Sequence, residues 1–350
     1  MVWRSYMRAI IYYDVEDFRV ENVPTPKIGA EEILVKVRAC GVCSTDLFRA
    51  IYHAAKPGSV LGHEIAGDVA EVGSGVTRFK AGDRVAVLHR APCGACYYCR
   101  HGQEPLCDQY RKAGIEPGGF AEYIRVAPAL VQKVVIKIPD SMTYEEATMT
   151  EPTACSVRAA TKSVIEPGDT ILIIGGGPLG LLNAQVAKFM GASQVIVSDH
   201  HDYRVKIAES LGVDYAFNAR KVNVEGKVRE LTDNRGADLV IVAVASTEAV
   251  HQSLKMVRCG GRICLFGDFR DVPQPNLNID PKIILRDNIK ILGSWGCSPQ
   301  DYHVAFNLIK MGRVKVGEMI THVFPMEKFT EALRVMAGKR CLRVVINPSG

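Results

Sequence analysis

Short apolar runs divide the first third of the chain into predicted strands. Turn-forming residues separate these runs, for example at Lys80-Ala81-Gly82-Asp83. Several short strands with turns between them are typical of an antiparallel barrel or sandwich. The predicted strands are Ala9–Tyr13, Ile33–Ala39, Ile65–Val72, Arg84–Leu88, Ala121–Val126 and Val134–Ile138.

The pattern changes after about residue 165, where continuous apolar strands alternate with helical stretches. This alternation predicts a parallel sheet that is covered by helices on both faces. A helix over Leu179–Met190 ends at Gly191, a natural C-terminal cap. Near the C-terminus, Met326, Phe329, Leu333 and Met336 fall on one face of a further helix. The buried strands are predicted at Thr170–Ile174, Val195–Ser198, Leu239–Val244, Arg262–Phe266 and Lys290–Leu292.

Length and composition place the chain among ordinary globular proteins. Its 350 residues are enough for about two domains, and 47% of them are hydrophobic and 23% charged. The net charge of +5 comes without a basic run, so nucleic-acid binding is not indicated. The N-terminus lacks the features of a targeting segment. The uncharged stretch 170–187 contains three successive glycines and a proline, which disfavours a membrane-spanning helix. We expect a cytoplasmic protein.

A glycine-rich turn connects the first apolar strand of the second region to its helix. Gly175, Gly177 and Gly180 form the pattern G-x-G-x-x-G. The first glycine permits a tight turn, the second lets the backbone approach a pyrophosphate, and the third lets the helix pack close to the strand. The helix N-terminus, which includes Pro178 and Leu179, then offers N–H groups and a partial positive charge to phosphates.

Asp199 lies just after the next strand, where a carboxylate accepts hydrogen bonds from the hydroxyls of an adenosine ribose. It would also repel a 2′-phosphate, which favours NAD over NADP. Three basic residues, His200, His201 and Arg204, follow closely and would help to tolerate a phosphate, so NADP stays an alternative. A tight turn without any ligand is the other interpretation of the glycines.

Four of the 11 cysteines are closely spaced as C-x2-C-x2-C-x7-C. They are Cys93, Cys96, Cys99 and Cys107. Four sulfur atoms in one loop suit tetrahedral zinc; an iron–sulfur cluster is the rival, and two local disulfides are disfavoured in an intracellular chain. Four protein ligands close the coordination shell, so we expect a structural zinc site.

A second constellation combines Cys43 with the pair His63-Glu64 in glycine-rich surroundings. A single histidine is more often a satisfied polar residue than a metal ligand. The combination is more specific, because Gly62-His63-Glu64-x-x-Gly67 precedes the four-cysteine run and the glycine-rich turn. In these motifs and their order, the chain resembles the zinc-dependent medium-chain alcohol and polyol dehydrogenases along nearly its full length.

The resemblance implies an α/β Rossmann domain, inserted into a mainly β GroES-like catalytic domain, and a catalytic zinc in the cleft between them. We place the catalytic domain at residues 1–155 with a structural-zinc lobe at about 90–110, the Rossmann domain at 156–294, and the return to the catalytic domain at 295–350. The relatives are usually homodimers or homotetramers, and no feature of this sequence decides between the two.

Site residues follow from the resemblance position by position. Cys43 and His63 match the first two catalytic-zinc ligands, and Glu151 matches the third, as in the sorbitol and threonine dehydrogenase branch. Glu64 matches a residue that approaches or exchanges onto the zinc. Asp46 matches the carboxylate that holds the ligating histidine. Thr45 matches the hydroxyl that passes the alcohol proton towards solvent.

The chain departs from many relatives at Phe48, where they carry a histidine that completes the proton relay. We expect Phe48 and Phe120 to line the substrate pocket as apolar walls. If Arg49 faces the site, it favours a substrate with a phosphate or carboxylate. Arg343 aligns loosely with a basic residue that reaches the cofactor pyrophosphate in relatives.

The sequence therefore predicts an NAD-dependent zinc dehydrogenase that interconverts a secondary alcohol, such as a polyol, and its ketone. Two zinc ions per chain are expected, one catalytic and one structural, with a small-molecule substrate as the partner. An L-threonine 3-dehydrogenase or a 2,3-butanediol dehydrogenase is the nearest alternative. The zinc-free quinone reductases are disfavoured because they lack these ligands. A catalytically silent zinc- and nucleotide-binding regulator is the alternative from another class.

Overall fold

A computed structural model describes residues 5–112, 114–269 and 276–349 of the chain. The chain divides into two units: unit 1 comprises Met1–Glu151, Cys297–Lys310 and Val316–Gly350, and unit 2 comprises Pro152–Gly296 and Met311–Lys315. Unit 2 is thus inserted into unit 1. None of the helices in the described ranges is both long and apolar enough to cross a lipid bilayer.

Unit 1 is built mainly from antiparallel strands. Its larger sheet has the order β16-β17-β3-β5-β6-β9, with β8 also paired to β3 and β7 to β8. A three-stranded sheet has the order β2-β1-β4. The strands are β1 (Tyr6–Asp14), β2 (Asp17–Pro24), β3 (Ile33–Gly41), β4 (Ser59–Val60), β5 (Glu64–Val72), β6 (Arg84–Leu88), β7 (Ile115–Glu116), β8 (Tyr123–Val126), β9 (Val135–Lys137), β16 (Ile320–Pro325) and β17 (Arg343–Asn347).

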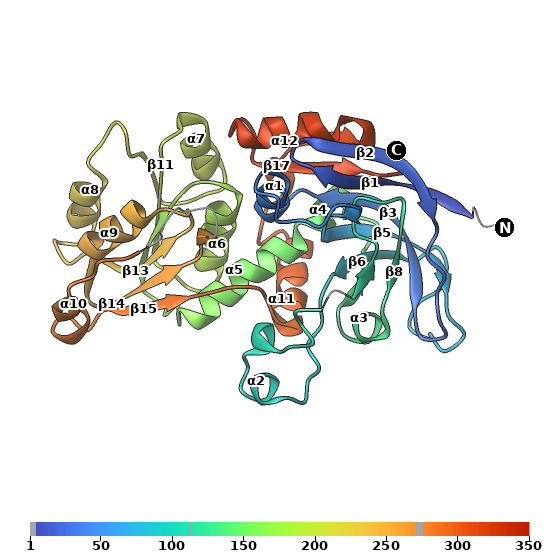
Figure 1. Cartoon of the computed structure of the whole chain (residues 1–350). Helices are drawn as coiled ribbons and strands as arrows, with labels where there is room; N and C mark the ends of the chain where they lie inside the picture. The colour runs from blue at the N-terminus through green and yellow to red at the C-terminus, as the bar shows by residue number, and fades with distance from the viewer. Residues whose placement is uncertain (1–4, 113, 270–275, 350) are drawn as a thin grey trace. The chain divides into compact units, whose positions relative to one another are not determined.

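Short helices connect and cover these strands. They are α1 (Ser44–Ile51), α2 (Tyr97–Arg100), α3 (Pro128–Lys133), α4 (Tyr144–Thr148), α11 (Pro299–Lys310) and α12 (Phe329–Ala337), while α5 (Thr150–Lys162) begins in unit 1 and continues in unit 2. The predicted C-terminal helix is confirmed as α12, in which Phe329 and Leu333 are buried and which lies against β16 and β17 (Figure 1).

All six predicted strands of the first region are present, but the sequence pattern missed others. The pattern missed β2 and β16 because both mix half-buried with exposed positions, and β2 also contains charged side chains. β17 is buried at four of its five residues, with an apolar centre. The sequence pattern missed it because the strand is short and follows closely after a helix.

Strand pairing gathers the candidate ligands of unit 1 at one edge of the larger sheet. Gly41 at the end of β3 is paired with Glu64 at the start of β5, which is paired with Leu88 at the end of β6. The segments that follow β3 and β6 and the segment that precedes β5 therefore leave the sheet at the same edge. Cys43, His63 and the residues after Leu88 lie on these segments.

Unit 2 contains the predicted parallel sheet, whose six strands have the order β12-β11-β10-β13-β14-β15. The strands are β10 (Thr170–Ile174), β11 (Gln194–Asp199), β12 (Tyr215–Asn218), β13 (Ala237–Val242), β14 (Val257–Leu265) and β15 (Lys290–Gly293), and the helices are α6 (Pro178–Phe189), α7 (Asp202–Ser210), α8 (Val224–Leu231), α9 (Thr247–Met256) and α10 (Pro281–Leu285). Counted from β10 this order is 3-2-1-4-5-6, which is the Rossmann order. The predicted Rossmann fold is confirmed.

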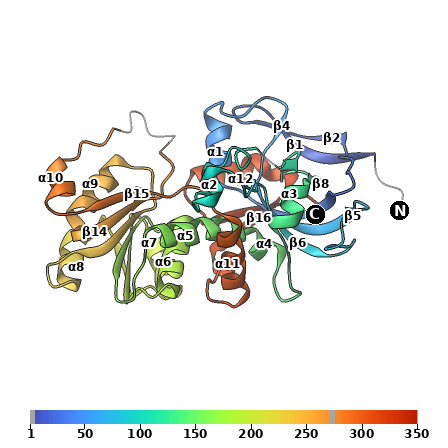
Figure 2. The same cartoon turned by 90° about the horizontal axis from the view of Figure 1, so that it is seen from below.

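The strand order also explains how the sheet is covered. From β10 the chain steps outward through α6 and α7, then returns past β10 and steps the other way through α8 and α9. Right-handed crossovers that run in opposite directions lie on opposite faces of a sheet. Helices α8 and α9 are neighbours (Figure 1), and β14 and β15 lie side by side at one edge of the sheet (Figure 2).

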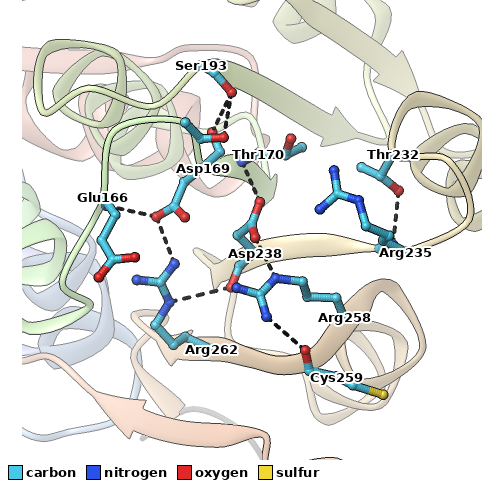
Figure 3. Close-up of polar contacts among 12 residues, drawn as sticks. Glu166, Asp169, Thr170, Ser193, Thr232, Arg235, Asp238, Arg258, Cys259 and Arg262 are labelled. Carbon is cyan, nitrogen blue, oxygen red and sulfur yellow. Dashed lines mark hydrogen bonds and ion pairs between the residues drawn. The ribbon is translucent and has the colours of Figure 1, made fainter.

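A network of buried ion pairs holds the amino ends of three strands of unit 2 together (Figure 3). Asp238 of β13 accepts the Thr170 amide of β10 at 2.8 Å and pairs with Arg258 of β14. Arg262 of β14 binds Asp169 at 2.7 Å. Both aspartates are at most 8% exposed, so each carboxylate depends on its partners for compensation.

We predict that Asp238→Ala destabilises unit 2 by about 3 kcal/mol, because it leaves the Thr170 amide without its acceptor and removes the carboxylate that pairs with Arg258. Hydrogen exchange of the Thr170 amide should accelerate, and the thermal unfolding midpoint should fall. Glu230→Ala is the matched control, since Glu230 forms an exposed pair with Lys227 that contributes about 0–1 kcal/mol. Equal stability of the two variants would contradict the role of the network.

Candidate metal centres and cofactor site

The four predicted cysteines come together in unit 1. One sulfur atom from each of Cys93, Cys96, Cys99 and Cys107 lies within 4.8 Å of the other three. The distance between the Cys93 and Cys99 sulfurs is 3.8 Å, and that between Cys96 and Cys99 is 3.5 Å. Tetrahedral zinc with Zn–S bonds of about 2.3 Å needs sulfurs about 3.8 Å apart. The donor set therefore fits a closed, structural zinc site.

Backbone amides support negative charge on these sulfurs. The Cys93 sulfur accepts the amides of Ala95 and Cys96 at 3.4 and 3.3 Å, and these hydrogen bonds lower the pKa of Cys93 to about 6. Burial raises the pKa of Cys99 to about 12. Metals bind the thiolate form of cysteine. A divalent cation at this site would therefore keep Cys99 deprotonated as well as Cys93, despite the raised pKa of Cys99.

The second cluster consists of Cys43, His63 and Glu64, whose candidate ligand atoms all lie within 4.8 Å of one another. The strand pairing described above places them together: Cys43 follows β3 and begins α1, and His63 directly precedes β5. Sulfur, imidazole nitrogen and carboxylate oxygen are all zinc ligands. Three protein ligands would leave a coordination position open for substrate.

Asp46 connects the two ligands. Its carboxylate accepts the Cys43 amide at 3.0 Å and the Gly62 amide at 3.4 Å, and lies 3.5 Å from His63 Nδ1. The side chain is fully buried. A carboxylate that holds one ring nitrogen of a histidine directs the other nitrogen to the metal. The structure thus places Asp46 where the predicted supporting role requires it.

Neighbouring charges shift the pKa values of Cys43, His63 and Asp46 in this cluster. Burial alone would raise the pKa of Cys43, but the hydrogen bond and charge of His63 lower it. Burial alone would lower the pKa of His63, whereas Asp46 and Cys43 raise it well above its ordinary value. Burial likewise opposes ionisation of Asp46, but His63 lowers the pKa of that carboxyl. A metal bound here would take the thiolate form of Cys43 and the neutral imidazole of His63, and would displace the protons on both.

Glu64 has a buried partner in Arg343. The two side chains form an ion pair, and they are 0% and 4% exposed. Gly41 makes room for this pair, because a Cβ at that position would collide with the Glu64 carboxylate and lie 3.1 Å from Arg343 Nη2. Arg343 thus has a carboxylate as its partner, whereas the sequence suggested a pyrophosphate; the latter contact stays a prediction.

Two predicted residues of this centre lie on the starts of helices. Thr45 is in the first turn of α1, two residues after Cys43. Glu151 is in the first turn of α5. Among the described residues, the cluster with Cys43 and His63 contains Glu64 and does not include Glu151. Ligation by Glu151 therefore stays a prediction.

The predicted pocket residues differ in their surroundings. Phe48 is half-buried on α1, and its ring is tilted against that of Tyr52 with centroids 5.1 Å apart. Phe120 is 0% exposed and packs against Phe329 at 4.9 Å. The structure places Phe120 in the hydrophobic core of unit 1, and this burial does not favour its predicted role as a pocket wall. Arg49 is half-buried in the last turn of α1.

In the glycine-rich turn of unit 2, each of the three glycines occupies a position with its own steric requirement. Gly175 has a φ of +106°, which favours glycine, and a Cβ at Gly180 would collide with the Gly175 carbonyl. At Gly177 a Cβ would meet only Arg204 Nη1, at 3.7 Å. Gly177 caps α6, with Pro178 and Leu179 as the first helical residues. The backbone at Gly177 is thus open to a phosphate at a helix N-terminus.

Asp199 ends β11 beside this turn. One carboxylate oxygen accepts the Gly176 amide at 2.8 Å and lies 3.3 Å from Arg204 Nη1; the other accepts the His201 amide at 2.9 Å. Burial opposes ionisation, but His201, Arg204 and the amides lower the pKa of Asp199. The carboxylate is therefore ionised at neutral pH and fixed next to the glycine-rich backbone.

Sequence reasoning missed two residues near the cluster of Cys43, His63 and Glu64. His89 and Arg90 follow β6, and the His89 ring lies 4.8 Å from that of His63, centroid to centroid. Their positions four and three residues before Cys93 are part of no recognised motif, so only the pairing of β5 with β6 reveals them.

Two known families match the two parts of the chain. Residues 29–140 match the family described as alcohol dehydrogenase GroES-like domain, and residues 178–311 match the family described as zinc-binding dehydrogenase. The chain is 32% identical to sorbitol dehydrogenase of Bacillus subtilis (strain 168), over 98% of each protein. It belongs to the zinc-dependent medium-chain dehydrogenase family.

Further relatives agree with this assignment. The dehydrogenase is 35% identical to L-threonine 3-dehydrogenase of Pyrococcus abyssi (strain GE5 / Orsay), over 93% of each chain. A solved structure described as a zinc-binding dehydrogenase from Sinorhizobium meliloti 1021, bound to NADP, matches with a TM-score of 0.89 and 30% identity, covering 99% of this chain and 100% of that one. The chain is accordingly a zinc-dependent alcohol or polyol oxidoreductase that uses a nicotinamide cofactor.

We predict that Arg343→Met destabilises the dehydrogenase by about 3–5 kcal/mol, because it leaves the buried Glu64 charge without compensation. The double variant Glu64→Gln/Arg343→Met should recover more than half of this loss. Thermal unfolding at a fixed zinc concentration measures both effects. Additive losses in the double variant would show that the two residues do not stabilise each other.

Proposed function

We propose that this dehydrogenase oxidises a secondary alcohol of a polyol to the ketone with NAD, and catalyses the reverse reduction. The observation that carries the proposal is the cluster of Cys43, His63 and a carboxylate at one sheet edge, in a chain that is 32% identical to a sorbitol dehydrogenase over nearly its full length. A second, four-cysteine site supports the proposal of two zinc ions per chain, one catalytic and one structural.

The residues of the catalytic centre have separate roles in this proposal. Cys43, His63 and Glu151 hold the catalytic zinc, and Asp46 fixes the orientation of His63. Glu64 approaches the ion or exchanges onto it. When Glu64 is away from the ion, Arg343 compensates the negative charge of its carboxylate. Thr45 passes the alcohol proton towards solvent. When bound, zinc supplies Lewis acidity at the substrate oxygen and the nicotinamide accepts the hydride.

The position of Asp199 supports NAD as the cofactor. Its ionised carboxylate lies at the end of β11, where the ribose hydroxyls of a dinucleotide bind in this fold. A 2′-phosphate at this point would meet that negative charge. Because Arg204 lies 3.3 Å from the same carboxylate, removal of the acid would leave a guanidinium facing the phosphate.

We predict that the purified protein contains two zinc ions per chain and reduces NAD with a polyol. Glu151→Ala should lower turnover at least tenfold with little change in the affinity for NADH, because NADH binding depends on unit 2 residues. Metal analysis, steady-state kinetics and NADH titration measure these quantities. Cys155→Ala is the matched control on the same helix, and it should keep both zinc ions.

Several results would contradict this proposal. About one zinc and no turnover with any alcohol would favour the silent zinc- and nucleotide-binding regulator. Full activity of Glu151→Ala would refute its role as a ligand. Faster turnover of L-threonine or 2,3-butanediol than of every polyol would assign the chain to one of those two activities.

We predict that Asp199→Ser shifts the cofactor preference from NAD towards NADP by at least tenfold in the ratio of kcat/KM values. The change removes the acceptor for the ribose hydroxyls and frees Arg204 to pair with a 2′-phosphate. Kinetics with both cofactors in the wild type and the variant provide the measurement. A wild-type enzyme that prefers NADP would overturn the assignment of Asp199.

The proposal includes a homo-oligomer, either a dimer or a tetramer, in the cytoplasm. The oligomer is what the resemblance to relatives implies, and the cytoplasm is our expectation from the sequence. Light scattering of the purified protein would distinguish the two assemblies.

A further inference from the structure

His89 presents an unsatisfied nitrogen beside the catalytic centre. Its ring lies 4.8 Å from that of His63, and its Nδ1 is shielded from solvent without a hydrogen-bond partner among the described residues. A buried polar atom left in this state costs about 1–3 kcal/mol. A polar group of a ligand at this centre would satisfy it.

Arg49 lies on the side of α1 that faces the same centre. It follows Asp46 by three residues, and residues three apart share one face of a helix. Asp46 on that face lies 3.5 Å from His63. In agreement with this placement, the Arg49 charge contributes to the lowered pKa values of Asp46, His89 and Arg90.

Arg90 is held in place by an aromatic ring. Its guanidinium carbon lies 5.9 Å from the centroid of Tyr110, whose hydroxyl accepts the Cys297 amide at 3.1 Å. A guanidinium supported by an aromatic face loses less freedom when it binds an anion. Arg90 also directly follows His89 at the end of β6, so one strand end carries both residues.

Positive charge accumulates around this edge of the sheet. Burial lowers the pKa of His89 well below its ordinary value, and the charges of His63, Arg90 and Arg49 lower it further. Burial also lowers the pKa of Arg90; Arg49 adds to this effect, and Glu151 opposes it. Among the acidic groups here, Asp46 faces His63, Glu64 faces Arg343, and Glu151 acts on Arg90. An anion that contacts Arg49 and Arg90 would be attracted by both guanidinium groups.

We propose that Arg49 and Arg90 bind the phosphate group of a phosphorylated polyol, and that His89 hydrogen-bonds a hydroxyl beside the reacting carbon. The inference rests on the proposed function, since it names the substrate class of the same centre. Guanidinium groups match phosphate with paired hydrogen bonds, which makes a phosphate monoester the favoured anion. An amino acid gains less from these charges, because the repulsion of its ammonium group offsets the attraction of its carboxylate.

The test compares neutral polyols with their terminal phosphates. Sorbitol, arabitol and galactitol are each paired with the corresponding phosphate, and gluconate and L-threonine serve as carboxylate probes. For the zinc-loaded protein we expect at least one phosphate to have a kcat/KM with NAD at least tenfold above that of its neutral partner. Calorimetry on the NADH-bound protein should show at least tenfold tighter binding of that phosphate.

Variants assign the effect to individual side chains. Arg49→Gln and Arg90→Gln should each lower the phosphate-to-neutral ratio of kcat/KM at least fivefold, and Arg49→Lys should restore part of it. His89→Phe should lower kcat/KM for both members of a pair and leave their ratio within twofold. Arg19→Gln is the control, because Arg19 pairs with Asp17 on β2 and should leave the ratio unchanged.

The outcomes separate this inference from the proposed function. Oxidation of neutral polyols with no preference for any phosphate, in both kinetics and binding, overturns the inference and keeps the function. A preference for gluconate over every phosphate also overturns it. If no alcohol is oxidised, the proposed function fails, and calorimetry still decides whether Arg49 and Arg90 bind phosphate.

Discussion

Hydrogen-bonded pairing of β3, β5 and β6 is the constraint on which the catalytic centre depends. Because neighbouring strands run antiparallel, the end of β3, the start of β5 and the end of β6 meet at one sheet edge. Cys43, His63 and His89 lie next to these ends although up to 46 residues separate them. A register shift of one residue would turn the adjoining side chains to the opposite face and separate the ligands.

The C-terminal strand completes this edge after the chain has passed through unit 2. β17 pairs antiparallel with β3, with Val345 opposite Gly41, and its first residue is Arg343. Arg343 compensates the Glu64 carboxylate, and Gly41 leaves the space that the pair occupies. Burying such a pair is costly unless both charges are well matched. Unit 1 therefore reaches its final electrostatic balance only once residues on both sides of the insertion have folded together.

The candidate site of unit 2 is built from backbone groups of the glycine-rich turn, with one carboxylate held beside them. Gly175 and Gly180 allow the strand and helix to approach closely, and Asp199 is oriented by the Gly176 amide. Buried ion pairs at the amino ends of β10, β13 and β14 stabilise the opposite end of the sheet. The glycine-rich turn and the network of ion pairs thus lie at opposite ends of β10, within one sheet.

The sequence by itself determined the local features of this protein. Apolar periodicity predicted the major strands, the spacing of Cys93 to Cys107 predicted a four-sulfur cluster, and the glycine pattern predicted the Rossmann turn, because each depends on residues close in the chain. Only the tertiary structure showed that Phe120 is buried in the core, that Arg343 pairs with Glu64, and that His89 lies beside His63. These contacts depend on strand register and on packing between distant segments, which local residue patterns do not specify.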